Sequence, residues 1–234
     1  MHYGHFKQQD PRVLKTLIEC FPFATISVNS PDGPITAHAP LTFRQGVTAN
    51  GMVEFHLAKE NPIMPYLQNG AKVTIVVSGP SAAISPSWYT ARFAGDKPDR
   101  SKTAPTYDYV NATFRGTLQA MDTEHLTAQI SDLVAAHEAA DGWKVQEIDP
   151  ATFTKWRDLI AGFRIPIESF DLTAKLSQEQ NPADKAGIIA GLRKRGASSD
   201  IAMATLIDVF DGSPESLITG LGSLNTKCNS VRNL

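Results

Sequence analysis

Cysteine is scarce in this 234-residue chain, which contains only Cys20 and Cys228, close to its two ends. Two cysteines so far apart in sequence fit neither a disulfide framework nor the Cys-x-x-Cys spacing of metal and redox sites. The six histidines also lack the paired His-x-x-x-His spacing that zinc enzymes use. We therefore expect a reduced, cytoplasmic context and no bound metal.

An excess of charge of one sign is lacking too, because 22 Lys and Arg residues balance 24 Asp and Glu residues, giving a formal net charge of -2. Overall charge therefore gives direct DNA binding no support. The sequence has no run of about eighteen apolar residues and no signal-like start, so we expect a soluble protein without a membrane partner. Walker, Rossmann and Gly-x-Ser-x-Gly patterns are also missing, which argues against nucleotide triphosphate binding and serine nucleophiles.

The composition, 42% hydrophobic and 20% charged, is that of a globular protein with a sizeable core. We expect one domain over residues 1–196. From residue 197 to 234 the sequence becomes small and polar, and we expect an appendage of uncertain order there.

Much of the first two thirds shows the alternating pattern of β-strands. The turn sequence Asn29-Ser-Pro-Asp-Gly33 separates two such segments and predicts a hairpin. Turns, rather than regularly alternating helices, separate the others, which favours an antiparallel barrel with a few helices. The expected strands are residues 24–28, 35–43, 52–57, 71–78, 82–89, 110–118 and 160–170.

Helices are expected where a capping residue precedes a proline or an apolar stripe. Asp10-Pro11 begins the first of them, and Asp122 caps a second. Asp149-Pro150 and Asn181-Pro182 begin two more. The last of these ends at Arg193-Lys-Arg195, where cations complement the negative end of the helix, so this basic triplet does not require a DNA contact.

Two histidines stand on the predicted polar faces of strands. In the strand over residues 35–43, Thr36 and His38 lie on the face opposite the apolar residues, because strand side chains alternate. Glu54 and His56 take the same position in the next strand. We expect these histidines to line one surface that could meet a ligand.

A candidate anion site follows the strand that ends at Leu57. Asn61-Pro62 resembles the start of a short helix, and Asn69-Gly70 resembles its end, with Lys59 beside its positive end. Such a helix end could hold a phosphate, although Pro62 and Pro65 remove two donors. A capped surface helix with a solvated lysine explains the same residues.

Trp88 and Tyr89 end the segment Gly79-Pro-Ser-Ala-Ala-Ile-Ser-Pro-Ser-Trp-Tyr89. Its two prolines predict extended, edge-like backbone, on which the aromatic rings could stack against a planar ligand. Ordinary packing of two aromatic residues in the core is the alternative.

Taken in order, these segments resemble the PaiB family, described as FMN-binding negative transcriptional regulators of the flavin split-barrel group, which includes pyridoxamine phosphate oxidases. The match spans about residues 2–195. The segments that carry it are Phe21-Pro-Phe-Ala-Thr25, Asp32-Gly33, Thr36-Ala-His-Ala-Pro-Leu41, His56-Leu-Ala-Lys-Glu-Asn-Pro62, Gly79-Pro80, Ser85-Pro-Ser-Trp-Tyr89, Pro105-Thr106, Lys175-Leu-Ser-Gln178 and Asp184-Lys-Ala-Gly187.

The resemblance implies a mainly β fold with helices, a six-stranded antiparallel split β-barrel with peripheral α-helices. It also implies a homodimer with FMN at the subunit interface. In split barrels the strand like Thr36–Leu41 lies against the isoalloxazine ring, and the stretch like Leu57–Asn61 meets the ribityl phosphate. The cofactor-binding residues that follow are Thr36, His38, Leu41, His56, Leu57, Ala58, Lys59, Asn61, Ser87, Trp88, Tyr89, Lys175 and Gln178.

The chain departs from the family pattern at several of these places. Family members usually have Arg where Lys59 stands, and losing a charge-assisted hydrogen bond of about 1.5 to 3 kcal/mol weakens phosphate binding. These departures predict weaker FMN binding or a different ligand. The other departures are at Ser81, Ala83, Tyr107, Glu179 and Gln180, where the family usually has His, Tyr, Trp, Asn and Arg.

Two functions follow from the resemblance. One is an FMN-binding regulatory or accessory protein of PaiB type. The other is an oxidoreductase of the pyridoxamine phosphate oxidase or flavin reductase type, with His38, His56 or Tyr107 as proton carriers. The sequence identifies no general base, so it leaves open whether the protein is an enzyme.

Overall fold

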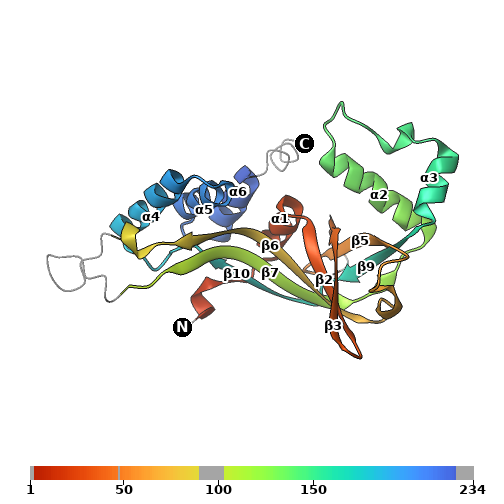
Figure 1. Ribbon diagram of the computed structural model, residues 1–234, viewed down its shortest axis with the longest axis horizontal. Coiled ribbons are helices and arrows are strands. Elements are labelled where there is room, and N and C mark those ends of the chain that lie inside the picture. Colours follow the sequence, from red (N-terminus) through yellow and green to blue (C-terminus); the bar gives the residue numbers. More distant parts are fainter. Residues whose placement is uncertain (1–2, 47, 90–102, 225–234) are drawn as a thin grey trace. The chain divides into compact units, whose positions relative to one another are not determined.

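The computed structural model describes residues 3–46, 48–89 and 103–224 (Figure 1). The chain forms two compact units, and the long strands β6 and β7 belong to both. Unit 1 comprises residues 1–16, 78–111 and 172–234, and unit 2 comprises residues 17–77 and 112–171. The boundary expected at residue 196, between a domain and an appendage, stays a prediction.

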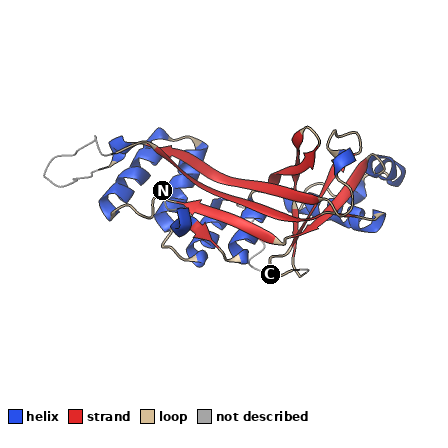
Figure 2. Ribbon diagram, turned by 90° about the horizontal axis from the view of Figure 1, so that it is seen from below, coloured by secondary structure: helices blue, strands red, loops and turns tan. Residues whose placement is uncertain are grey.

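The strands form two antiparallel sheets (Figures 1 and 2). The first has the order β1-β10-β7-β6-β2-β3, with bounds Lys7–Gln8, Ser169–Lys175, Thr106–Thr117, Lys72–Ile84, Phe23–Ser30 and Gly33–Pro40. The second has the order β4-β5-β9-β8, with bounds Thr42–Arg44, Met52–Ala58, Ile160–Pro166 and Gln119–Ala120. The expected antiparallel pairing is confirmed, and helices are prominent beside the sheets, so the fold is a mixed α and β fold.

Capping residues begin three helices where the sequence predicts them. Asp122 accepts the backbone N–H of His125, and Asp149 and Asn181 cap helices that start with proline. Gly196 ends the third of these helices with a positive φ of 76°, a conformation that favours glycine. The α-helices are α1 (Pro11–Cys20), α2 (Thr123–His137), α3 (Pro150–Arg157), α4 (Pro182–Arg195), α5 (Ser198–Val209) and α6 (Pro214–Leu224).

The predicted hairpin is confirmed as β2 and β3, which pair from Phe23 opposite Pro40 to Ser30 opposite Gly33. Gly33 turns the chain with a φ of 113°. The register places Thr25 opposite His38. Inward-facing residues of this hairpin, such as Ile26, are fully buried, as the alternation predicts.

Two predicted strand boundaries are wrong. Residues 71–78 and 82–89 do not form two strands, because β6 runs unbroken through Gly79 and Pro80 as far as Ile84. The paired register of β6 with β2 ends at Val76, so Pro80 costs that pairing no hydrogen bond. Residues 85–89 are not extended throughout either, because Pro86–Trp88 is a 3₁₀ turn.

The segment over residues 160–170 is two strands rather than one. β9 ends at Pro166, which has no N–H to continue the ladder. The Ile167 N–H still donates to the Gly51 carbonyl, next to β5, whereas the Glu168 N–H donates to the Arg115 carbonyl on β7, so the backbone changes partners there.

The short α-helix predicted after Asn61 is also wrong. The backbone N–H groups of Met64 and Tyr66 bond to carbonyl groups three residues back, and only Met64–Tyr66 is a 3₁₀ turn. Pro65 has no N–H to bond four residues back to the Asn61 carbonyl, so an α-helix cannot propagate here.

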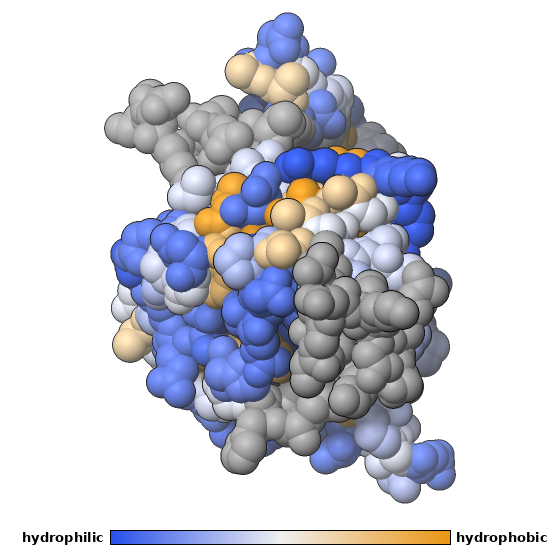
Figure 3. All heavy atoms as spheres, turned by 90° about the vertical axis from the view of Figure 1, so that its left-hand side faces the viewer, coloured by the Kyte–Doolittle hydropathy of each residue, from blue (hydrophilic) through white to orange (hydrophobic). Residues whose placement is uncertain are grey.

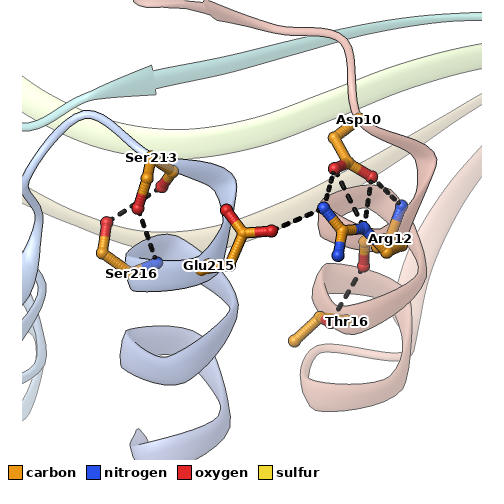
Figure 4. Close-up of polar contacts among 6 residues, drawn as sticks. All are labelled: Asp10, Arg12, Thr16, Ser213, Glu215 and Ser216. Atoms are coloured by element: carbon orange, nitrogen blue, oxygen red, sulfur yellow. Dashed lines mark hydrogen bonds and ion pairs between the residues drawn. The ribbon is translucent and has the colours of Figure 1, made fainter.

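Residues 198–224, whose order the sequence leaves open, form α5 and α6 in unit 1. Their apolar faces are buried through residues such as Met203 and Leu217. An ion pair joins the starts of α1 and α6, where Arg12 Nη2 lies 2.7 Å from Glu215 Oε1 (Figure 4). Ser213 Oγ accepts the Ser216 N–H and caps α6 in the same view.

Most visible described atoms in Figure 3 belong to hydrophilic residues, with a small apolar group between them. This distribution agrees with apolar side chains directed inward. In unit 2 the core includes Phe55, Ile75 and Phe114, all fully buried. Of the helices in the described part of the chain, none has the length and apolarity that a membrane crossing needs.

Candidate functional site

The outer face of β3 in unit 2 is open and carries the polar groups that the alternation predicts. Thr36 and His38 are exposed, whereas Ala37, Ala39 and Leu41 are buried. The imidazole of His38 stacks on the ring of Phe23, with 6.1 Å between the ring centroids and 16° between the planes. Phe23 is itself 67% exposed. The pair therefore forms a flat, accessible aromatic surface beside a hydroxyl group.

The corresponding face of β5 is not open in the same way, because α2 packs against β4, β5 and β9. His56 is half-buried, and its Nδ1 lies 2.7 Å from Oε1 of Gln129 on α2. Glu54 is buried on this face and accepts a 2.7 Å bond from Arg44, which also pairs with Asp132 at 2.6 Å. His38 and His56 thus belong to different sheets and have different surroundings.

The loop that follows β5 uses most of its own backbone donors. The N–H groups of Lys59, Asn61 and Met64 donate to backbone carbonyl groups, and the N–H of Ile63 donates to the Asn61 side chain. Leu57 is buried, while Ala58 and Lys59 are exposed. With no helix end and few unused N–H groups, an anion would depend on the Lys59 ammonium group.

The Lys59 ammonium is bonded to the backbone rather than to a carboxylate, within the described residues. Its Nζ donates to the backbone carbonyl of Asp158 at 2.7 Å and, within the described residues, makes no ion pair. Lys59 and Arg157 line a depression of about 210 Å³ in unit 2, with Leu126 and Phe163 among its apolar residues. Asp122 and Asp158 line it as well, so its charges are mixed.

In unit 1, Trp88 is held by its own neighbours. A Cβ atom at Gly191 would lie 2.3 to 2.5 Å from three atoms of the indole ring, so the absence of a side chain there lets α4 approach the ring. Gly187 admits the Trp88 carbonyl in the same way. On the indole, the guanidinium of Arg195 stands 5.0 Å from the ring centroid. Ser87 is exposed, and Tyr89 is half-buried.

Lys175 and Gln178 use their polar groups within unit 1. Lys175 Nζ donates to the Thr106 hydroxyl group and, at 2.8 Å, to the Tyr107 carbonyl. The Gln178 side chain accepts from the Leu176 N–H at 2.7 Å and donates to the Ala174 carbonyl at 2.9 Å. Both side chains therefore stabilise the end of β10 and the turn after it.

Asp108 is a buried charged residue that the sequence reasoning missed. Its Oδ2 accepts a hydrogen bond from Ser177, and its Oδ1 has no hydrogen-bond partner. Burial raises the pKa of Asp108 to about 6, although the Ser177 bond and the charge of Lys175 act in the opposite direction. The pKa of Tyr89 is raised too, by burial and then by the charges of Asp108 and Asp184. Alternation could have revealed Asp108, because it shares its strand face with Val110 and other core residues.

The predicted cofactor-binding residues fall into two groups. Eight lie in unit 2, namely Thr36, His38, Leu41, His56, Leu57, Ala58, Lys59 and Asn61. Five lie in unit 1, namely Ser87, Trp88, Tyr89, Lys175 and Gln178. Their role in binding a cofactor stays a prediction.

Proteins that bind flavins share this arrangement of antiparallel sheets and helices. The flavocytochrome Anf3 of Azotobacter vinelandii superposes with a TM-score of 0.58 at 13% identity, over 80% of this chain and 77% of that one. The FAD and heme binding protein of Mycobacterium smegmatis gives a TM-score of 0.51 at 14% identity, over 80% of each chain. At these identities the likeness establishes the fold alone.

The chain belongs to the family described as "Putative FMN-binding domain", whose sequence profile matches residues 1–169. It is also 23% identical over 206 residues to the protease synthase and sporulation protein PAI 2 of Bacillus subtilis, which covers 87% of this chain and 94% of the relative. A protein of Emericella nidulans is 24% identical over 232 residues, covering 83% of this chain and 91% of the relative. The resemblance to the PaiB family is confirmed.

Proposed function

We propose that this protein binds FMN, and that its cofactor contacts come mainly from unit 2. The observation that carries the proposal is the open face of β3, where Thr36 and His38 stand exposed beside Phe23 in a member of an FMN-binding family. A flat surface of this kind suits an isoalloxazine ring, since stacked aromatic systems attract each other.

The described residues fit the two ends of FMN unequally. At the ring, the exposed hydroxyl and imidazole of Thr36 and His38 can donate or accept hydrogen bonds. At the phosphate, the exposed ammonium of Lys59 gives one cation, while most backbone N–H groups of its loop are already used. When bound, FMN would supply the capacity to accept and pass on electrons. We expect moderate rather than tight affinity.

We propose further that two copies form a homodimeric split barrel of PaiB type. β3 is an edge strand of its sheet, and Phe23 next to it is 67% exposed. Exposed strand edges and exposed aromatic side chains favour association with another chain. In this reading the protein is a negative transcriptional regulator or an accessory flavoprotein, the role that the PaiB resemblance implies.

Reconstitution with FMN tests the proposal directly. The purified protein is incubated with FMN and desalted, its visible absorption spectrum and gel-filtration volume are recorded, and FMN affinity is then measured by flavin fluorescence. Lys59→Ala should weaken binding about tenfold or more, because a charge-assisted hydrogen bond to phosphate is lost. Lys155→Ala, at an exposed position on α3, serves as the matched control. A colourless protein that binds no FMN even at millimolar concentration would rule out the proposal.

A flavin-dependent oxidoreductase is the second candidate. It is supported by the exposed imidazole of His38, which could carry a proton to or from a bound ligand, and by the fold shared with a flavocytochrome. Steady oxidation of NAD(P)H or of pyridoxamine phosphate by the FMN-loaded protein, lost in His38→Ala, is the expected result. An FMN-loaded protein that reacts with none of these reductants would favour the regulatory role.

A further inference from the structure

Arg157, the last residue of α3, lines the depression of about 210 Å³ in unit 2 and has hydrogen-bond donors to spare. Its side chain is only 20% exposed, and its guanidinium makes no hydrogen bond to any residue that the structure describes. The nearest carboxylate oxygen, Oδ1 of Asp158, is 3.6 Å away, which is longer than a hydrogen bond, and the ring centroid of Phe153 is 5.9 Å away. A guanidinium carries five N–H donors in a fixed fork. This fork is therefore available to a ligand in the depression.

A carboxylate stands next to this cation. The Asp158 side chain is 67% exposed and makes no hydrogen bond within the described ranges of the chain. The Lys59 ammonium donates to the backbone carbonyl of the same residue and so holds this end of α3 in place. Asp122 lines the depression too, but its Oδ1 accepts the backbone N–H of His125 and lies 2.7 Å from the Nδ1 atom of that ring. The unused pair of opposite charges is therefore that of Arg157 and Asp158.

The remaining wall of the depression is largely apolar. Leu126 on α2 and Phe163 on β9 both line it, and they are only 6% and 3% exposed. An apolar cavity of about 150 Å³ holds benzene, so a depression of this size has room for one phenyl ring or a branched aliphatic chain. Gly162 keeps the wall open, because a Cβ atom there would lie 3.0 Å from Leu126 Cδ1 and from Met121 Sδ.

The balance of charge indicates which kind of ligand suits this wall. The lining holds two cations, Lys59 and Arg157, and two carboxylates, Asp122 and Asp158. A simple anion would be attracted by the first pair and repelled by the second, whereas a zwitterion can place an opposite charge against each. The ammonium and carboxylate groups of an α-amino acid are joined through one carbon atom. They are thus about as close together as the charges of Arg157 and Asp158.

We propose that this depression is a binding site for a free α-amino acid with an apolar side chain. Arg157 binds the carboxylate through its fork, Asp158 binds the ammonium group, and the apolar side chain lies against Leu126 and Phe163. The site does not rest on the proposed FMN binding. Lys59, which is the proposed phosphate contact of FMN, is a neighbour that positions the end of α3 and is not required for the amino acid carboxylate.

Calorimetric titration of the full chain with three related probes tests the ligand class. The probes are L-phenylalanine, 3-phenylpropanoate, which lacks the ammonium group, and 2-phenylethylamine, which lacks the carboxylate. L-phenylalanine should bind about tenfold more tightly than either, because each of the others loses a charge-assisted hydrogen bond. Binding of 3-phenylpropanoate as tight as that of L-phenylalanine would overturn the zwitterion. No binding of L-phenylalanine at millimolar concentration would overturn the site.

Variants at the wall test the contacts. Arg157→Gln should bind L-phenylalanine about tenfold or more weakly, and Arg157→Lys, which keeps the charge but not the fork, should lose less. Asp158→Asn should weaken L-phenylalanine but not 3-phenylpropanoate, since only the first has an ammonium group. Gly162→Ala should weaken both by crowding the apolar wall. Lys155→Ala, exposed on the same helix, is the matched control and should bind like the wild type.

Melting temperatures show that each variant is folded, and Asp158→Asn, at an exposed position, covers the case in which Arg157→Gln is not. Equal affinity for L-phenylalanine in the wild type and in either of these variants would overturn the assigned contacts.

The same titration on FMN-saturated protein separates this site from the proposed flavin site. L-phenylalanine should bind equally well with and without FMN. Loss of its binding in the FMN-loaded protein would show that the flavin occupies the depression, and it would overturn a separate amino acid site. Binding of L-phenylalanine by a protein that binds no FMN would refute the proposed function and leave the amino acid site standing.

Discussion

Replacing Asp108 with asparagine should stabilise the protein at neutral pH. The carboxyl group is fully buried on β7, its Oδ1 has no hydrogen-bond partner, and Lys175 Nζ is 3.8 Å from that oxygen. Burial raises the pKa from 3.8 to about 6 and outweighs the opposing effects of Ser177 and Lys175. The folded protein therefore holds a proton on Asp108 more tightly than the unfolded chain does.

The sign and size of the effect follow from this pKa. A group whose pKa is higher in the folded state contributes most to stability below its unfolded value of 3.8, and this contribution is lost as the pH rises through about 6. A difference of about two pKa units corresponds to about 3 kcal/mol at 1.36 kcal/mol per unit. Asparagine has the same shape and can still accept from Ser177, but it loses the attraction to Lys175. We expect Asp108→Asn to gain about 1 to 3 kcal/mol at pH 8.

Urea unfolding at several pH values between 5 and 8 measures this gain. The difference in unfolding free energy between Asp108→Asn and the wild type should be smallest at pH 5 and largest at pH 8. Asp141→Asn, at an exposed position, should show no such trend. A wild type that is as stable as Asp108→Asn at pH 8, or a difference that stays constant with pH, would refute the reasoning.

Other substitutions test the close packing described above. Gly191→Ala should lower the melting temperature and shift the emission of Trp88, because the added methyl group would overlap the indole ring. Such overpacking costs about 1 to 3 kcal/mol of stability, which exceeds the roughly 1 kcal/mol that alanine gains over glycine in helix propensity. Gly116→Ala should destabilise by about 2 kcal/mol or more in urea, since its Cβ would lie 2.2 Å from the Pro166 carbonyl oxygen. Arg195→Ala should lower the free energy of unfolding by about 1 to 3 kcal/mol, because the buried carboxylate of Asp200 loses its charged partner. The same substitution should make the Trp88 emission more solvent-like. Unchanged melting temperatures in these variants would contradict the packing.

Helix starts and the hairpin could be predicted from sequence because each depends on a few adjacent residues. Asp149 and Asn181 cap helices at the predicted positions, since a carboxylate or amide oxygen before proline satisfies the N–H groups of the first turn. Gly33 similarly fixes the turn between β2 and β3. Such signals need no knowledge of what packs on the element.

Predictions failed where a local signal had two meanings. Pro80 lies in β6 beyond Val76, where the pairing of β6 with β2 ends, so its missing N–H interrupts no hydrogen bond of that pair. Pro62 suits the start of an α-helix, but Pro65 prevents that helix from continuing. Asp108 could be placed on an inward face by alternation, yet its raised pKa comes from burial by the folded chain, against the opposing effects of Ser177 and Lys175, which lie far along the chain.

The candidate site shows the same limit on a larger scale. Alternation correctly places His38 and His56 on the polar faces of their strands, but it does not say what covers each face. On β3 the face is open, and His38 stacks on Phe23. On β5 the face is covered by α2, and a buried glutamine from that helix bonds to His56. Two histidines that look equivalent in the sequence therefore differ in their surroundings, because the His38 imidazole is exposed and the His56 ring is hydrogen-bonded to a buried glutamine.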